Sequence, residues 1–176
     1  IQGFKDIIQG KSVANLDSLQ LTSGKNFGGL FTLNKLASDL FISHAMGNSK
    51  QASLALLMVF GRILTHGSRR HLKFWQEGQA IHEVLRIESF DEDDLYETLD
   101  WLEKNQAKIE NKLFASRYSN EKATLFLYDI TSSYLEGDHN ELATYGYNRD
   151  GKKGKKQIVI GLITDTMGYP IAIEVF

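Results

Sequence analysis

Asp129 is the side chain of this sequence best placed to do chemistry, because it is a carboxylate in the middle of an apolar run. The run, ATLFLYDITSSYLEG over residues 123–137, is rich in β-branched and aromatic residues and predicts a β-strand. A charge among apolar neighbours is costly unless water, a hydrogen-bond donor or a bound cation compensates it. The pattern alone leaves two interpretations open: a cation-binding carboxylate, or a strand aspartate satisfied by a backbone donor or an Asx turn.

The neighbours of Asp129 along the strand supply hydroxyl groups. Strand alternation places Asp129 on one face with Leu125, Leu127, Thr131 and Ser133. The other face carries Phe126, Tyr128, Ile130, Ser132 and Tyr134. A single carboxylate is therefore expected between apolar and hydroxyl-bearing side chains.

A second candidate group is the cationic run TYGYNRDGKKGKK, residues 144–156. It carries +4, so the rest of the chain, whose total is −2, carries −6. The positive residues are Arg149, Lys152, Lys153, Lys155 and Lys156, and Tyr145 and Tyr147 stand just before them. Such a loop suits contacts with nucleic-acid phosphates and stacking on bases, without reading of sequence. It is equally typical of a solvated hairpin tip whose lysines keep an edge soluble.

Residues 157–176 predict a β-hairpin. Its first strand is apolar on both faces, and Gly161 within it indicates the close approach of another element. Asp165 belongs to the turn DTMG, where we expect a turn residue rather than a ligand. Glu174 is a charge inside the second apolar strand, and the pattern leaves open a functional role and a place at the rim.

The strands follow a segment with helical periodicity. Residues 1–26 are expected to be a poorly ordered lead-in, and residues 27–120 a helical module. Helix caps are predicted at Thr32, Ser49, Ser68 and Asp91, with helices over 50–65 and 69–76 and a loop over 78–88. The acidic residues after Asp91 favour the start of a further helix.

Composition limits the class of protein. The 176 residues are 42% hydrophobic and 24% charged, as in a soluble globular protein. The absence of cysteine excludes disulfides and thiolate chemistry. The five histidines lack zinc-ligand spacing, and GKKGKK lacks the Ser/Thr and helix of a nucleotide-binding loop. No apolar run is long enough to span a membrane and no signal-peptide pattern opens the chain, so a cytoplasmic protein is expected.

Three blocks of the sequence match a known combination. They are Asp129 with its hydroxyl-rich run, EGDHNELATYGYNRDG over 136–151, and the paired strands of 157–176. Together they resemble the catalytic core of DDE-class transposases of bacterial insertion sequences, in the group with a long β insertion. The resemblance implies an α+β fold, in which the helical module precedes the first three antiparallel strands of a ribonuclease-H-like core, residues 121–176.

The same resemblance implies phosphoryl transfer on double-stranded DNA, at element ends and target, with Mg²⁺ as cofactor. In such enzymes three carboxylates hold two ions, and Asp129 matches the first. We expect the chain to be truncated before the other two, since it stops in an apolar strand, and to be inactive alone. The cationic loop is expected to contact DNA, and the enzyme to self-associate in a synaptic complex.

Two other functions stay open. One is a non-catalytic DNA-binding or assembly module, and the other is a ribonuclease-H-like nuclease unrelated to transposition. In the family fold the strand of Asp129 pairs on its second side with a strand missing here. The isolated chain is therefore expected to oligomerise or precipitate.

Overall fold

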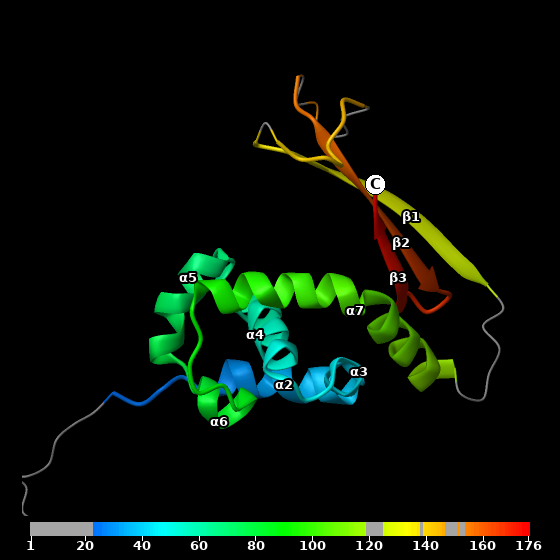
Figure 1. Cartoon of the computed structure of the whole chain (residues 1–176). Coiled ribbons are helices and arrows are strands. Elements are labelled where there is room, and N and C mark those ends of the chain that lie inside the picture. The colour runs from blue at the N-terminus through cyan, green and yellow to red at the C-terminus, as the bar shows by residue number, and fades with distance from the viewer. Residues whose placement is uncertain (1–22, 119–124, 138, 147–150, 152–153) are drawn as a thin grey trace, which may run out of the picture.

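The computed structural model describes residues 23–118, 125–137, 139–146, 151 and 154–176. Figure 1 shows a cluster of helices joined through the long helix α7 to a three-stranded sheet. The mixed α+β class is therefore confirmed. Among the described residues, no helix is both long and apolar enough to cross a membrane. The elements are α2 (Gly28–Asp39), α3 (Ile42–Met46), α4 (Lys50–Thr65), α5 (Arg69–Trp75), η2 (Gln76–Gly78), α6 (Ile81–Leu85), α7 (Glu92–Tyr118), β1 (Phe126–Tyr134), β2 (Gln157–Asp165) and β3 (Pro170–Val175).

The helical part is built around α4, which is apolar on most of its surface. Its Leu54 and Leu57 are almost completely buried, together with Leu30 of α2 and Leu95 of α7. Burial of a leucine side chain contributes about 1.5–3 kcal/mol. This core therefore holds the first turns of α7 and sets the direction in which that helix leaves toward the sheet.

The segment expected as a loop over 78–88 is partly helical, so that prediction is wrong. It contains α6, whose Ile81 and Leu85 are buried in the same core. The segment is held from the other side by Asn26, which donates its backbone N–H to Gly78 and accepts from the N–H of Ala80. Hydrophobic packing of two residues is enough to fix a helix too short to stand on its own propensity.

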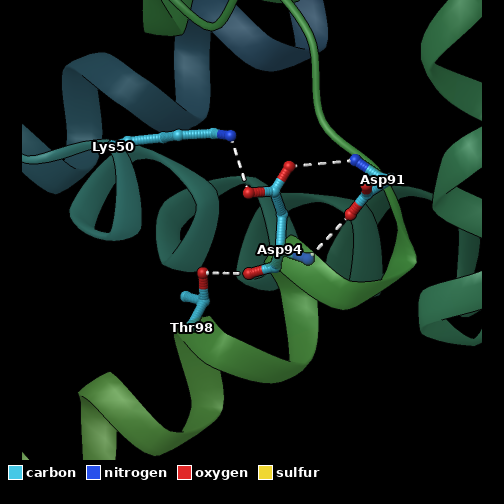
Figure 2. Close-up of polar contacts among 4 residues, drawn as sticks. All are labelled: Lys50, Asp91, Asp94 and Thr98. Carbon is cyan, nitrogen blue, oxygen red and sulfur yellow. Dashed lines mark hydrogen bonds and ion pairs between the residues drawn. The ribbon is translucent and has the colours of Figure 1, made fainter.

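The start of α7 is closed by two aspartates, as Figure 2 shows. The N–H of Asp94 donates to the carboxylate of Asp91 at 2.9 Å, and the N–H of Asp91 donates to the carboxylate of Asp94 at 3.1 Å. The second oxygen of Asp94 lies 2.6 Å from the ammonium of Lys50 at the start of α4. This reciprocal arrangement satisfies backbone donors that the first turn of a helix leaves free, so the cap predicted at Asp91 is confirmed.

Replacing Asp91 by alanine is expected to lower the free energy of unfolding by about 1 kcal/mol, the usual cost of losing an N-cap. The hydrogen bond from Lys50 and then that from the Asp91 N–H hold the pKa of Asp94 below its usual value. Alanine at position 91 keeps its backbone N–H and leaves Lys50 in place. The stabilisation linked to the lowered pKa of Asp94, which is present above about pH 4 and lost as the pH falls through the lowered pKa, should therefore remain in both chains. Urea unfolding of the two chains measures the difference. Asp93→Ala, an exposed first-turn aspartate, is the matched control and should change stability far less.

The sheet is antiparallel throughout, with β2 in the middle. Asp129 on β1 pairs with Leu162 on β2, which pairs with Ile173 on β3. Residues directly opposite in a sheet share a face, so these three lie on one side. The neighbouring row, on the other side, consists of Ile130, Gly161 and Glu174.

The outer edge of β3 is covered by side chains of α7. Gln106 donates its side-chain amide to the carbonyl of Ile173 at 2.7 Å, and the N–H of Ile173 donates to the carboxylate of Glu110 at 3.2 Å. Further along the helix, the guanidinium of Arg117 donates to the carbonyl of Pro170 at 3.0 Å. The helix thus takes the place of a neighbouring strand and anchors the sheet to the helical part.

Candidate functional site

Asp129 lies at the centre of β1 and is exposed to solvent. Leu162 stands opposite it, and Leu127 and Thr131 flank it on the same face of the strand. Within the described chain no hydrogen bond or ion pair engages its carboxylate. The second interpretation of the sequence was that a backbone donor or an Asx turn satisfies Asp129. The described residues show no such hydrogen bond, so the carboxylate is free to bind a ligand.

Glu174 does not join Asp129, because its row lies on the opposite face of the sheet. It lines a groove of about 660 Å³ between the sheet and α7, together with Glu103, Glu110 and Tyr128. A Cβ at Gly161 would lie 2.4 Å from the hydroxyl of Tyr128 across this groove floor, which confirms the close approach predicted for that glycine. The Asp129 face is consequently the one turned away from α7.

The described residues do not complete a metal centre around Asp129. Among them, no three His, Asp or Glu side chains lie close enough together to hold an ion. Mg²⁺ takes six oxygen ligands and is usually held by one or two carboxylates plus water or phosphate oxygens. The two ions expected from the resemblance need more acidic ligands than Asp129 supplies, so the site as described fits one ligand of such a centre and not the centre itself.

The described end of the cationic run, Lys155 and Lys156, lies at the far end of the β1–β2 pair. Other members of the run, Tyr147, Arg149, Lys152 and Lys153, fall outside the described residues. Lys155 is exposed and its ammonium lies 3.1 Å from the carboxylate of Glu136. The N–H of Leu135 donates to the carbonyl of Lys156 at 2.8 Å, which continues the pairing of the two strands by one residue. Lys155 and Lys156 are therefore carried on the same β-ribbon as Asp129.

The spacing between the two candidate groups follows from this ribbon. Lys156 stands opposite Leu135, six positions along from Asp129, which corresponds to about 20 Å at about 3.3 Å per residue. Continued alternation also places Lys156 on the Asp129 face. This is about the length of six nucleotides of a nucleic-acid strand.

The base of the cationic run is fixed by Gln157, a buried polar residue that sequence reasoning missed. Its N–H donates to the carbonyl of Thr144 at 2.9 Å, and its carbonyl accepts from the N–H of Thr144 at 3.1 Å. A Cβ at Gly146 would lie 2.7 Å from the side-chain nitrogen of Gln157. The sequence feature that could have identified Gln157 is its place as a polar residue at the first position of an otherwise apolar strand. The EGDHNELATYG segment therefore returns to β2 before the cationic residues begin.

Asp165 has the structural role expected of it. Its carboxylate accepts from the N–H groups of Met167 at 2.9 Å and Tyr169 at 2.8 Å, and from the hydroxyl of Tyr118 at the end of α7. The guanidinium of Arg117 lies 4.6 Å from the centre of the Tyr169 ring. These contacts close the β2–β3 turn and fasten it to α7, so Asp165 is not available as a ligand.

Replacing Tyr118 by phenylalanine is expected to lower the melting temperature and to expose the β2–β3 turn to hydrogen exchange. The hydrogen bond from Tyr118 is the main cause that lowers the pKa of Asp165, and the same bond raises the pKa of Tyr118. The stabilisation should be lost at low pH, as the pH falls through the lowered pKa of Asp165, and at high pH, as it rises through the raised pKa of Tyr118.

Melting temperatures of the two chains between acidic and alkaline pH measure this effect. The difference should be largest between about pH 5 and 9, where the ordinary carboxyl and phenol both keep the charge states that the bond requires. Tyr145→Phe, at a highly exposed tyrosine, is the control and should leave the profile unchanged. A difference that is constant at all pH values would show that the bond does not stabilise the fold.

Comparisons with protein-family models, with curated proteins and with solved structures found no match to this chain. The resemblance to transposases therefore rests on the three sequence blocks, and what it implies about activity is argued as a proposal below.

Proposed function

We propose that this chain is part of a DDE-class DNA transposase of a bacterial insertion sequence, acting in the cytoplasm. In this proposal Asp129 is the first of three carboxylates, and the cationic run over 144–156 holds double-stranded DNA. The observation that carries it is the position of Asp129, exposed and without a partner among the described residues, on the same ribbon as Lys155 and Lys156. Water compensates the charge of this exposed carboxylate, so the support for a ligand role is that no described side chain or backbone group engages it and that it stands in the first of the three matching sequence blocks.

The chain's own residues have separable tasks in this proposal. Lysines of the cationic run, with Lys155 and Lys156 at its end, neutralise phosphates and hold the DNA along the ribbon without reading its sequence. Asp129 lies about 20 Å away along the strands, at the position where the DNA backbone would receive a carboxylate-bound ion. Mg²⁺, when bound by a complete set of acids, supplies the electrostatic stabilisation of phosphoryl transfer.

The proposal makes a first test possible on the 176 residues themselves. They should bind duplex DNA in a fluorescence anisotropy titration, with an affinity that falls steeply as salt rises. Because one carboxylate does not complete the ion site, they should not cut the DNA when Mg²⁺ is added. Cutting is expected only from a longer polypeptide that carries the two further acids. Salt-independent binding, or no binding at low salt, would contradict the proposal.

A second candidate function is a non-catalytic module that binds DNA or assists assembly. It is favoured by the absence of an acidic cluster around Asp129 in the described part of the chain. The two functions differ in the role of Asp129, since a module that only binds DNA has no need of this carboxylate. The effect of Asp129→Asn on cutting therefore separates them.

A further inference from the structure

The helical part contains a polar cavity of about 920 Å³ that is open to solvent. The residues that line it lie between Asn34 and Ser89, on α2 and α3, at the start of α4, and on α6 with the segment that follows it. Five serines and two asparagines are among them. A concave site of this volume with many hydrogen-bonding groups has the size of a small-molecule binding site.

The cation of this cavity that is free to bind a ligand is Arg86. Lys50, which also lines the cavity, is held by the carboxylate of Asp94 (Figure 2). In the described part of the chain, neither an ion pair nor a side-chain hydrogen bond engages the guanidinium of Arg86. A guanidinium binds the oxygens of a phosphate through two parallel N–H donors. Arg86 is therefore suited to hold a single phosphate group.

The backbone of Arg86 is strained. It lies in the left-handed region, with a φ of 57°, directly after the last residue of α6. Glycine adopts this conformation without a steric cost, whereas a residue with a Cβ does not. Residues held in such conformations concentrate at functional sites. The strain supports a function for the side chain of Arg86, because glycine at this position would give the more stable fold.

Glu88 adds an acceptor beside this cation. Ile87 is buried between Arg86 and Glu88, which are both exposed and both line the cavity. Nothing among the described residues pairs with the carboxylate of Glu88. A carboxylate accepts hydrogen bonds from sugar hydroxyls, as in dinucleotide-binding folds, and repels phosphate. Together the two side chains suit a ligand that carries a phosphate and hydroxyl groups side by side.

A third observation is the hydroxyl of Ser43. Of the side-chain oxygens and nitrogens in the described residues, its Oγ is the one that is buried without a hydrogen-bond partner. Buried polar groups normally have a partner. Since Ser43 lines the cavity, rotation about its χ1 angle presents the hydroxyl to a bound molecule. A ligand would thus satisfy a group that the fold leaves unsatisfied.

We propose that this cavity binds a small molecule in which a phosphate is attached to a sugar. Arg86 holds the phosphate, while Glu88 and the serine hydroxyls bind the sugar. A free sugar phosphate and a mononucleotide share this chemistry. A DNA backbone does not fit, because holding successive phosphates takes several free cations and Glu88 would repel them. The site shares no residue with Asp129 or the cationic run, so it goes beyond the proposed function and does not depend on it.

Titration of the isotope-labelled chain with ribose 5-phosphate, followed by NMR, is the first test. The amide signals of Ser43 and residues 86–89 should shift to saturation, with a dissociation constant of about 1 mM or lower. Inorganic phosphate and ribose each lack half of the ligand and should bind about tenfold more weakly. Adenosine 5′-monophosphate identifies the source: a clearly higher affinity than that of ribose 5-phosphate indicates a nucleotide, and an equal or lower one a free sugar phosphate.

Arg86→Gly separates binding from structure because it acts on the two in opposite directions. It should weaken ribose 5-phosphate binding by about tenfold, through loss of the charged donor. It should also raise the melting temperature by about 2–4 °C, because glycine relieves the strain. Glu88→Ala should reduce the preference for ribose 5-phosphate over inorganic phosphate. Arg70→Ala, at an exposed arginine of α5 outside the cavity, is the control and should leave binding unchanged.

Four results would overturn the proposal. The first is the absence of a saturable shift at the cavity, and the second is equal binding of ribose 5-phosphate and inorganic phosphate, which would mean an adventitious ion only. The third is unchanged binding by the Arg86→Gly variant. The fourth is a shift of the same signals by a DNA duplex, which would make the cavity part of a DNA-binding surface.

Discussion

In a polypeptide that carries this chain together with the two further acids, Asp129→Asn is expected to reduce Mg²⁺-dependent DNA cutting by about a thousandfold. Loss of one electrostatic stabiliser of a transition state commonly costs 10²–10³ in rate, and the first carboxylate of an ion site stands at the upper end of this range. Asparagine keeps the size of the side chain and removes only its charge. The exposed position of Asp129 makes this a clean substitution, because no partner among the described residues is left behind unpaired.

Two measurements separate this result from a general loss of function. Duplex binding by the Asn variant should stay within about twofold of the unmodified protein, since the phosphate contacts lie in the cationic run. Asp100→Asn, at an exposed aspartate of α7, should leave both cutting and binding unchanged. Cutting by the Asp129 variant at a rate within tenfold of the unmodified protein would exclude the catalytic role and leave the DNA-binding module.

The helices that the sequence predicted are those with a local signal at both ends. Ser49 caps α4 and Ser68 caps α5 as expected, through bonds of 3.2 and 3.3 Å to backbone N–H groups. The cap predicted at Thr32 is wrong, because α2 already begins at Gly28 and has no side-chain cap. The start of α2 depends on burial of one face of the helix against α4. No residue type at the helix boundary predicts that burial.

The short helices α3 and α6 were missed for a related reason. They are bounded by left-handed backbone at Phe41, with a φ of 61°, and at Arg86, with a φ of 57°. Glycine is the residue that usually marks such positions, because side chains with a Cβ rarely adopt them. Phe41 and Arg86 are themselves exposed, whereas their neighbours Ala45, Leu85 and Ile87 are buried. Burial of these neighbours depends on the tertiary fold, which local residue types do not predict.

Within the candidate site, the sequence predicted residues but not their relative placement. Alternation along a single strand was enough to put Asp129 between Leu127 and Thr131. The face on which Glu174 lies depends on the β2–β3 register, which contains a shift between Ile163 and Thr164. A shift of one residue moves a side chain to the other face, so the separation of Glu174 from Asp129 needed the structure.

Neutralising Lys152, Lys153, Lys155 and Lys156 together as glutamines is expected to flatten the salt dependence of DNA binding. Each phosphate contact contributes about 0.9 to the slope of log K against log salt, so the slope should fall by about 3.6 if all four lysines make such contacts, with at least a hundredfold loss of affinity at low salt. Lys155 is already paired with Glu136, at a bond exposed to water. Glu136→Gln should therefore tighten binding modestly.

The matched control removes the same number of positive charges from a different part of the chain. Lys73, Lys104, Lys108 and Lys112 are exposed on α5 and α7, away from the β1–β2 ribbon. Their replacement by glutamine removes four positive charges and should change the slope by less than one unit, because long-range electrostatics are screened beyond about 10 Å at 0.1 M salt. Equal effects of the two quadruple variants would mean that DNA responds to the net charge of the chain, and that the cationic run is only the soluble tip of a hairpin.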